Sequence, residues 1–124
     1  MQNGFIKIYR QMTEWEWYRD TVTKSVFLHL LLTASWKPMR YKGKEYPAGT
    51  VITTTERLSE ELGFSAKQIR RALANLQKTG ELGNHRGSHE AIYIISNYAV
   101  FQGFENENFS KNAETGQSQG NHTI

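Results

Sequence analysis

Apolar residues recur with a helical period in two neighbouring segments in the middle of the chain. The first segment contains Leu58 and Leu62, four residues apart on one face, followed by Gly63, a residue suited to the left-handed end of a helix. The second segment carries an apolar stripe made of Ile69, Ala72, Leu73 and Leu76. The pattern predicts two short helices joined by a turn of three or four residues, over about 54–80.

Capping signals delimit both predicted helices. Thr53 and Glu56 have the spacing of a capping box, in which side chains satisfy the unpaired amides of the first helical turn. Ser65 and Gln68 repeat this spacing at the start of the second helix. Thr79–Gly80 is expected to close it. Local signals therefore agree with the apolar period at each boundary.

Short β-prone segments flank the helical pair. Residues 48–53 precede it, and a β-branched run at 92–95 follows it after a glycine-serine turn. We expect residues 81–96 to form a hairpin with Arg86 and His89 at its basic tip. The order strand, helix, turn, helix, hairpin is that of a winged helix.

A further helix is predicted ahead of these elements. Asp20 or Thr21 can cap it, and its apolar pattern over about 22–35 faces the core. Leu28 and Leu32 extend the apolar surface around this pattern, so we expect the helix to be buried on more than one side.

All three tryptophans lie in the segment around this helix. Trp15, Trp17 and Tyr18 can cover the helix within one subunit, or they can form the interface of a homodimer. Core packing is favoured, but the two alternatives are compatible, because surplus apolar area can serve both purposes.

Length and composition fit one domain. The chain has 124 residues, 38% of them hydrophobic, which is enough for a single core. We therefore expect an α+β fold over residues 1–103, a winged helix-turn-helix with an added N-terminal aromatic-rich helical segment. Residues 104–124 are polar and unpatterned, and we expect them to form a disordered tail.

Positive charge is concentrated in the predicted domain. The net charge is +3, and residues 104–124 contain one lysine and three glutamates, so residues 1–103 carry +5. Residues 65–86 hold five basic residues and one acidic residue, and residues 37–45 hold four and one. Such patches suit the binding of phosphate backbones by counterion release, although a charge of +5 predicts weak binding by a monomer.

The sequence lacks the parts of common enzymes. It has no cysteine, one aspartate and no glycine-rich phosphate loop, so we expect no catalytic residues, metal site or cofactor. His85 and His89 have a spacing used for zinc on helices, but they lie across a predicted turn, which favours incidental histidines. The densest apolar stretch, 26–32, is too short to span a bilayer, and no export signal opens the chain. We expect a cytoplasmic protein without membrane contact.

The DNA-binding hypothesis assigns roles by helix geometry. The start of the second helix is expected to enter the major groove. Ser65 and Lys67 would then bind phosphate, while Gln68, Arg70 and Arg71 are candidates for base edges. Arg70 is the first choice, because Arg71 lies 100° further round and can instead contact phosphate or pair with an acid.

Two other groups complete the predicted interface. Arg86 and His89 could reach the adjacent minor groove from the hairpin tip. Thr54 and Thr55 could donate hydroxyl contacts to phosphate from the supporting helix. We expect duplex DNA to be preferred over single-stranded DNA.

Five segments of the sequence carry a family resemblance: GFIKIYRQM, EWEWY, FLHLLLTASW, PAGTVITTTERLSEELGFSAKQIRRALANLQKTGE and YIISNYAVFQ. Residues 4–102 resemble the N-terminal winged-helix domain of phage replisome organisers and DnaD-like primosomal proteins. The resemblance implies a replication-initiation protein of a phage, prophage or mobile element in a bacterial host. Such a protein binds origin DNA and contacts replication proteins such as a helicase loader.

Full-length members of that family carry a second helical domain after a linker, and this sequence shows no counterpart to it. Two other hypotheses therefore stay open. One is a winged-helix transcriptional regulator, and the other is a protein-interaction or oligomerisation scaffold without direct DNA contact.

Overall fold

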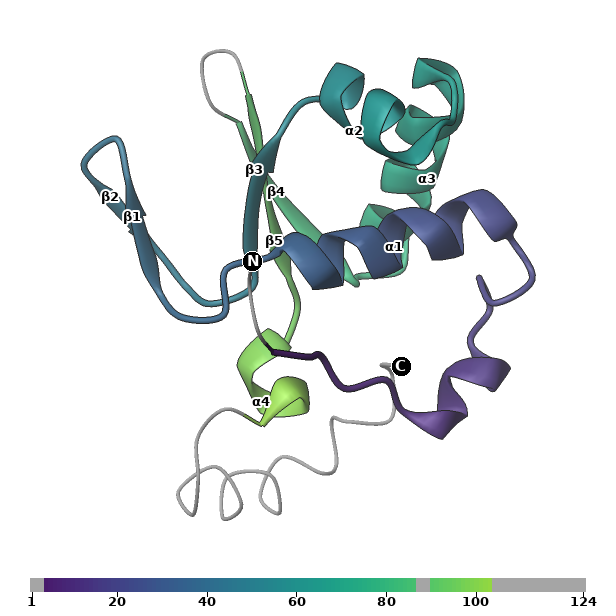
Figure 1. Cartoon of the computed structure of the whole chain (residues 1–124), viewed down its shortest axis with the longest axis horizontal. Helices are drawn as coiled ribbons and strands as arrows, with labels where there is room; N and C mark the ends of the chain where they lie inside the picture. The colour runs from purple at the N-terminus through teal and green to yellow at the C-terminus, as the bar shows by residue number, and fades with distance from the viewer. Residues whose placement is uncertain (1–3, 87–89, 104–124) are drawn as a thin grey trace.

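The computed structural model describes residues 4–86 and 90–103, which form a mixed α+β fold (Figure 1). Its helices are α1 (Thr21–Thr33), α2 (Thr55–Leu62), α3 (Ala66–Lys78) and α4 (Tyr98–Gln102), with a 3₁₀ turn at Arg10–Glu14. Its strands are β1 (Met39–Tyr41), β2 (Lys44–Tyr46), β3 (Thr50–Thr53), β4 (Leu82–Arg86) and β5 (Ala91–Ile95). Strands β3, β5 and β4 form one antiparallel sheet in that order, and β1 and β2 form a second, separate hairpin.

The α2–α3 unit follows the predicted pattern closely. Gly63 ends α2 with a left-handed φ of 82°, and only three residues separate the two helices. Ser65 and Gln68 form the predicted capping box at the start of α3. Thr79 caps its end, and Gly80 takes a positive φ of 91° there. Both helices and their connection are thus confirmed.

The predicted capping box of Thr53 with Glu56 is wrong by one residue. Thr54 is the N-cap of α2, and its hydroxyl accepts a hydrogen bond from the Arg57 amide at 3.0 Å. Thr53 is instead the last residue of β3, where it pairs with Ala91 and is buried. Strand pairing therefore decides which threonine of the run caps the helix.

Helix α1 begins as predicted but ends two residues early. The Asp20 carboxylate accepts from the Thr23 amide and caps its start. At its end, the Ser35 amide donates to the Thr50 carbonyl of β3, so Ser35 belongs to the connection with the sheet. Leu28 packs partly against the core, but Leu32 is 66% exposed, so the expected burial on several sides does not reach Leu32.

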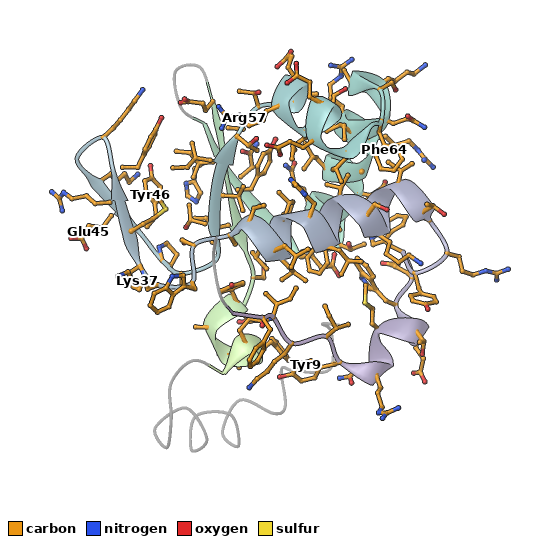
Figure 2. The ribbon with its side chains drawn as sticks, viewed as in Figure 1. Tyr9, Lys37, Glu45, Tyr46, Arg57 and Phe64 are labelled. Atoms are coloured by element: carbon orange, nitrogen blue, oxygen red, sulfur yellow. The ribbon has the colours of Figure 1, made fainter. Side chains whose placement is uncertain are left out.

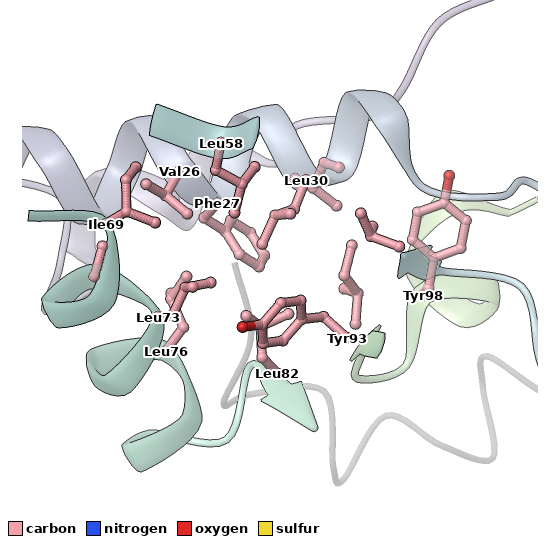
Figure 3. Close-up of a cluster of buried hydrophobic side chains, with 14 residues drawn as sticks. Val26, Phe27, Leu30, Leu58, Ile69, Leu73, Leu76, Leu82, Tyr93 and Tyr98 are labelled. Atoms are coloured by element: carbon pink, nitrogen blue, oxygen red, sulfur yellow. The ribbon is translucent and has the colours of Figure 1, made fainter. Parts of the chain in front are cut away.

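The core lies between the helices and the three-stranded sheet (Figure 3). Its fully buried large side chains come from three helices: Val26 and Leu30 of α1, Leu58 of α2, and Ile69 and Leu76 of α3. The sheet adds Val51, Tyr93 and Ile95 to the same cluster. Burial of several such side chains, each contributing about 1.5–3 kcal/mol, fixes α3 against the rest of the domain.

The β4–β5 hairpin confirms the predicted strands, with Leu82 opposite Ile95 and Arg86 opposite Ala91. Residues 87–89, including His89, lie outside the described residues, as do residues 104–124 and the disorder expected there. Within the described part of the chain, no helix is long and apolar enough to cross a membrane.

The N-terminal segment is held by α4, an element that the sequence pattern did not predict. The Lys7 amide donates to Gln102 Oε1 at 2.7 Å, and Gln102 Nε2 donates to the Lys7 carbonyl at 3.2 Å. The Tyr9 hydroxyl also donates to the Phe101 carbonyl. The buried Gln102 side chain thus pairs with both backbone groups of Lys7, as a neighbouring strand would. These bonds hold the N-terminal segment on the side of the molecule opposite the α2–α3 turn (Figure 1).

Candidate nucleic-acid interface

Helix α3 has opposite apolar and cationic faces. Successive residues of an α-helix are rotated by about 100°, which brings every third or fourth residue to the same side. The outer side holds an exposed cationic stripe of Lys67, Arg70, Arg71 and Lys78. The inner side holds the buried residues Ile69, Ala72, Leu73 and Leu76. Packing of the inner side therefore orients the cationic stripe outward.

The capping box occupies two of the predicted contact residues. Ser65 Oγ accepts from the Gln68 amide at 3.1 Å, and Gln68 Oε1 accepts from the Ser65 amide at 2.9 Å. Reading of adenine by glutamine uses both the oxygen and the nitrogen of the side-chain amide. Since the Gln68 oxygen is engaged, full readout by Gln68 would break the cap, and its Nε2 group is the part that can donate to DNA.

The two arginines of the stripe differ in their surroundings. Arg71 Nη1 lies 3.8 Å from Asp20 Oδ2, so the alternative in which Arg71 faces an acid is present in the structure. Lys67 and Arg70 form no ion pair with any of the described residues. Lys67 and Arg70 are therefore the cations of the first turns of α3 with the least internal compensation.

Helix α2 supplies a second set of groups. Thr54 accepts a hydrogen bond as the N-cap, so its hydroxyl proton can still be donated to a ligand, and Thr55 begins the helix beside it. Arg57 is an exposed cation one turn further on, which sequence reasoning missed. Figure 2 shows Arg57 between the β1–β2 hairpin and Phe64 of the α2–α3 turn. The signal that could have found it is its position three residues after the cap.

The predicted basic tip of the wing is placed only in part. Arg86 is the last residue of β4, opposite Ala91, and His89 lies outside the described residues. His85, nearer the base of the hairpin, is exposed, and its ring meets the edge of Tyr46 with the centroids 6.5 Å apart.

A second basic hairpin lies beside β4–β5. Its charges at residues 37–45 were expected from the sequence, but its strands were not. The signal was the pair Lys42–Gly43, which takes positive φ angles of 51° and 79°, as a two-residue hairpin turn requires. Tyr41 Oη donates to Glu90 Oε1 at 2.6 Å, and this bond to a carboxylate raises the pKa of Tyr41. The hairpin is thereby attached to the start of β5.

The aromatic N-terminal segment makes its polar contacts within the chain. Trp15 Nε1 donates to Glu81 Oε2 at 2.9 Å, and its ring packs on Phe27. Trp17 Nε1 donates to Thr79 Oγ1 at 2.9 Å, while Lys24 lies over the ring of Tyr18. These contacts are those of the core alternative. The dimer interface predicted for Trp15, Trp17 and Tyr18 stays a prediction, since each ring is only partly buried.

Glu81 is a buried carboxylate that sequence reasoning did not single out. Its two oxygens meet Trp15 Nε1 and the Thr79 hydroxyl, and the residue is only 6% exposed. It thus ties the aromatic segment to the end of α3, although 66 residues separate it from Trp15.

Replacing Glu81 with alanine is expected to destabilise the fold by about 2–3 kcal/mol, because it leaves the Trp15 indole without its acceptor. Glu81→Gln keeps an oxygen for the indole and should lose less than about 1 kcal/mol. Urea unfolding monitored by tryptophan fluorescence measures both values. Equal stability of the alanine variant and the wild type would contradict this role.

In comparisons with protein-family models, curated proteins and solved structures, the chain has no match. Its function is therefore inferred from the site geometry and the sequence.

Proposed function

We propose that this chain is a winged-helix protein that binds duplex DNA through α3. The element order supports the proposal, because α1, β3, α2, α3 and the β4–β5 hairpin follow one another as in that fold class. The β1–β2 hairpin is then an insertion between the first helix and the first strand.

The observation that carries the proposal is the outer face of α3. Lys67 and Arg70 are exposed, lack ion pairs within the described residues, and lie on a helix whose inner face is fully buried. A helix fixed in this way can enter a major groove without rearrangement of the core. Its cations would neutralise phosphates or donate to guanine, the base that arginine contacts most often.

More particularly, we propose a role in replication initiation, with origin DNA as the ligand and a helicase loader as a protein partner. This step is supported by the resemblance of residues 4–102 to replisome organisers. A transcriptional regulator would bind DNA through the same face of α3. The DNA sequence that is bound therefore distinguishes a regulator from a replication-initiation protein. Selection from a random duplex library should recover a site that lies in a replication origin, whereas a promoter site would favour the regulator.

A second candidate function is protein interaction. The observation that favours it is the exposure of two large apolar side chains near the end of α1, Leu32 at 66% and Trp36 at 54%. A scaffold of this kind would bind protein through that surface and would show no salt-dependent affinity for DNA.

Fluorescence anisotropy of labelled duplex and single-stranded DNA, measured with the wild-type chain across a salt series, tests the proposal. We expect tighter binding to the duplex, weakening with salt by about 0.9 log units per log unit for each phosphate contact. A folded sample that binds neither form in a salt-dependent way would overturn DNA binding and leave the scaffold.

A further inference from the structure

The β1–β2 hairpin projects from the domain and is strongly basic. Residues 37–46 contain four basic residues and one acid: Lys37, Arg40, Lys42, Lys44 and Glu45. Arg40 pairs with Glu45 across the two strands at 3.0 Å. The three lysines are exposed and form no ion pair within residues 4–86 and 90–103. The hairpin therefore keeps an excess of positive charge at its surface.

Aromatic rings support these lysines. Each ammonium lies over a neighbouring ring: Lys37 over Trp36 at 5.0 Å, Lys42 over Tyr41 at 5.4 Å and Lys44 over Tyr46 at 5.8 Å. A ring attracts the ammonium through its face but does not neutralise its charge. The N–H groups that point away from the ring remain able to donate to a phosphate. The rings thus restrain the lysine side chains without neutralising their positive charge, as an acidic partner would do.

The β1–β2 hairpin is attached to the β4–β5 hairpin, which is the wing of the proposed winged helix. Two-stranded hairpins are marginally stable alone, so this one depends on its contacts with the domain. Tyr41 hydrogen-bonds to Glu90 at 2.6 Å, and buried Tyr46 meets His85 of β4 edge to face. Both tyrosines contact residues of the β4–β5 hairpin or its immediate flank. The position of β1–β2 is therefore set by the β4–β5 hairpin, whose tip is expected to reach the minor groove.

The hairpin also lies on the same side of the molecule as the proposed interface. In Figure 1 the turn of β1–β2, the Arg86 end of β4 and the α2–α3 turn all lie toward the upper edge, whereas the N-terminal segment and α4 lie at the lower edge. Figure 2 shows Glu45 on this hairpin, Lys37 ahead of β1 at the base of the hairpin, and Arg57 between the hairpin and Phe64. In this view the exposed cation Arg57 thus lies between the hairpin and the α2–α3 turn.

From this arrangement we propose that β1–β2 is a second wing, whose Lys42 and Lys44 bind backbone phosphates of the duplex held by α3. It lengthens the contacted DNA on the flank beyond β4–β5. This inference rests on the proposed DNA binding. The partner is duplex DNA, since the exposed cations project from a two-stranded element attached to the β4–β5 hairpin of the proposed DNA-binding domain.

Anisotropy titrations with two duplexes test the second wing. One duplex spans the selected site, and the other extends it by about one helical turn on both sides. The wild type is expected to bind the longer duplex more tightly and with a steeper salt slope. Lys42→Ala/Lys44→Ala should abolish that difference, reducing the magnitude of the slope on the longer duplex by about 1.8, or 0.9 for each phosphate contact.

Controls separate this inference from the proposed function. Lys7→Ala/Arg10→Ala removes the same charge from exposed positions on the opposite side and should bind both duplexes like the wild type. Lys42→Gln/Lys44→Gln should repeat the effect of the alanine pair, and circular dichroism establishes that each variant is folded. If the wild type binds DNA and both hairpin variants bind the two duplexes as the wild type does, the second-wing proposal alone is overturned. A hairpin effect confined to single-stranded DNA would overturn it too, and absence of wild-type binding would overturn both proposals.

Discussion

Replacing Gly49 with alanine is expected to destabilise the protein by about 2–6 kcal/mol, the sum of backbone strain and overpacking. Gly49 has a φ of 92°, a conformation that side chains with a Cβ rarely adopt. An added Cβ would lie 2.5 Å from Tyr98 Cβ and 2.7 Å from its Cγ. Tyr98 is only 4% exposed and belongs to the core cluster, so it has little room to withdraw.

The backbone of Gly49 cannot yield either. Its amide donates to the Ser35 carbonyl at 2.7 Å, and its carbonyl accepts from the Ile95 amide at 2.9 Å. The expected loss is a large fraction of the free energy of unfolding of a small domain, which is about 5–15 kcal/mol. Urea unfolding followed by tryptophan fluorescence would show a lower midpoint. Gly43→Ala is the matched control, because Gly43 has a φ of 79° but nothing within 4 Å of an added Cβ. Equal losses in the two variants would contradict the steric argument.

The elements predicted well are those specified by neighbouring residues. Gly63, Ser65 and Gln68 lie within six positions of one another, and their turn and capping chemistry operates locally. The cap of α2 shows the limit of such signals. Three successive threonines can each cap a helix, and Thr54 is selected only because Thr53 is paired with Ala91 of β5.

The features that sequence reasoning missed depend on distant partners. Glu81 resembles a surface residue in sequence, and its burial is compensated by an indole from Trp15, 66 positions away. The β1–β2 hairpin has strands of three residues, too short for an alternating pattern to stand out. Its docking on Glu90 and His85 exists only in three dimensions.

The candidate site was predictable in outline. The helical period placed Lys67, Arg70 and Arg71 outside the apolar stripe, and the structure places all three on the exposed side. The helical period could not predict which residues from other parts of the chain lie beside these three cations. Arg71 faces Asp20 from the start of α1, and Gln68 uses its oxygen in the cap. Among the candidate DNA contacts at the start of α3, Lys67 and Arg70 are thus the cations without an ion pair to any described residue.

The double variant Lys67→Ala/Arg70→Ala is therefore expected to lose most duplex binding. An arginine that reads a base contributes about 1–3 kcal/mol, and a lysine at a phosphate adds about 0.9 to the magnitude of the salt slope. Both side chains are exposed, so the fold should survive their removal. Anisotropy with the selected duplex should show an affinity loss of roughly five- to 150-fold for the arginine contact alone.

The matched control for the α3 variant is Lys7→Ala/Arg10→Ala, which removes two positive charges from exposed positions of the N-terminal segment, the segment at the lower side of Figure 1. If binding depended only on overall charge, the two double variants would weaken it equally. A specific role of α3 requires that the control bind like the wild type. The two arginines can also be compared singly. Because Arg71 already faces Asp20 at 3.8 Å, the Arg71→Ala variant should lose less affinity for the duplex than the Arg70→Ala variant. An Arg71→Ala defect larger than that of Arg70→Ala would reverse the assignment and make Arg71 the reading residue.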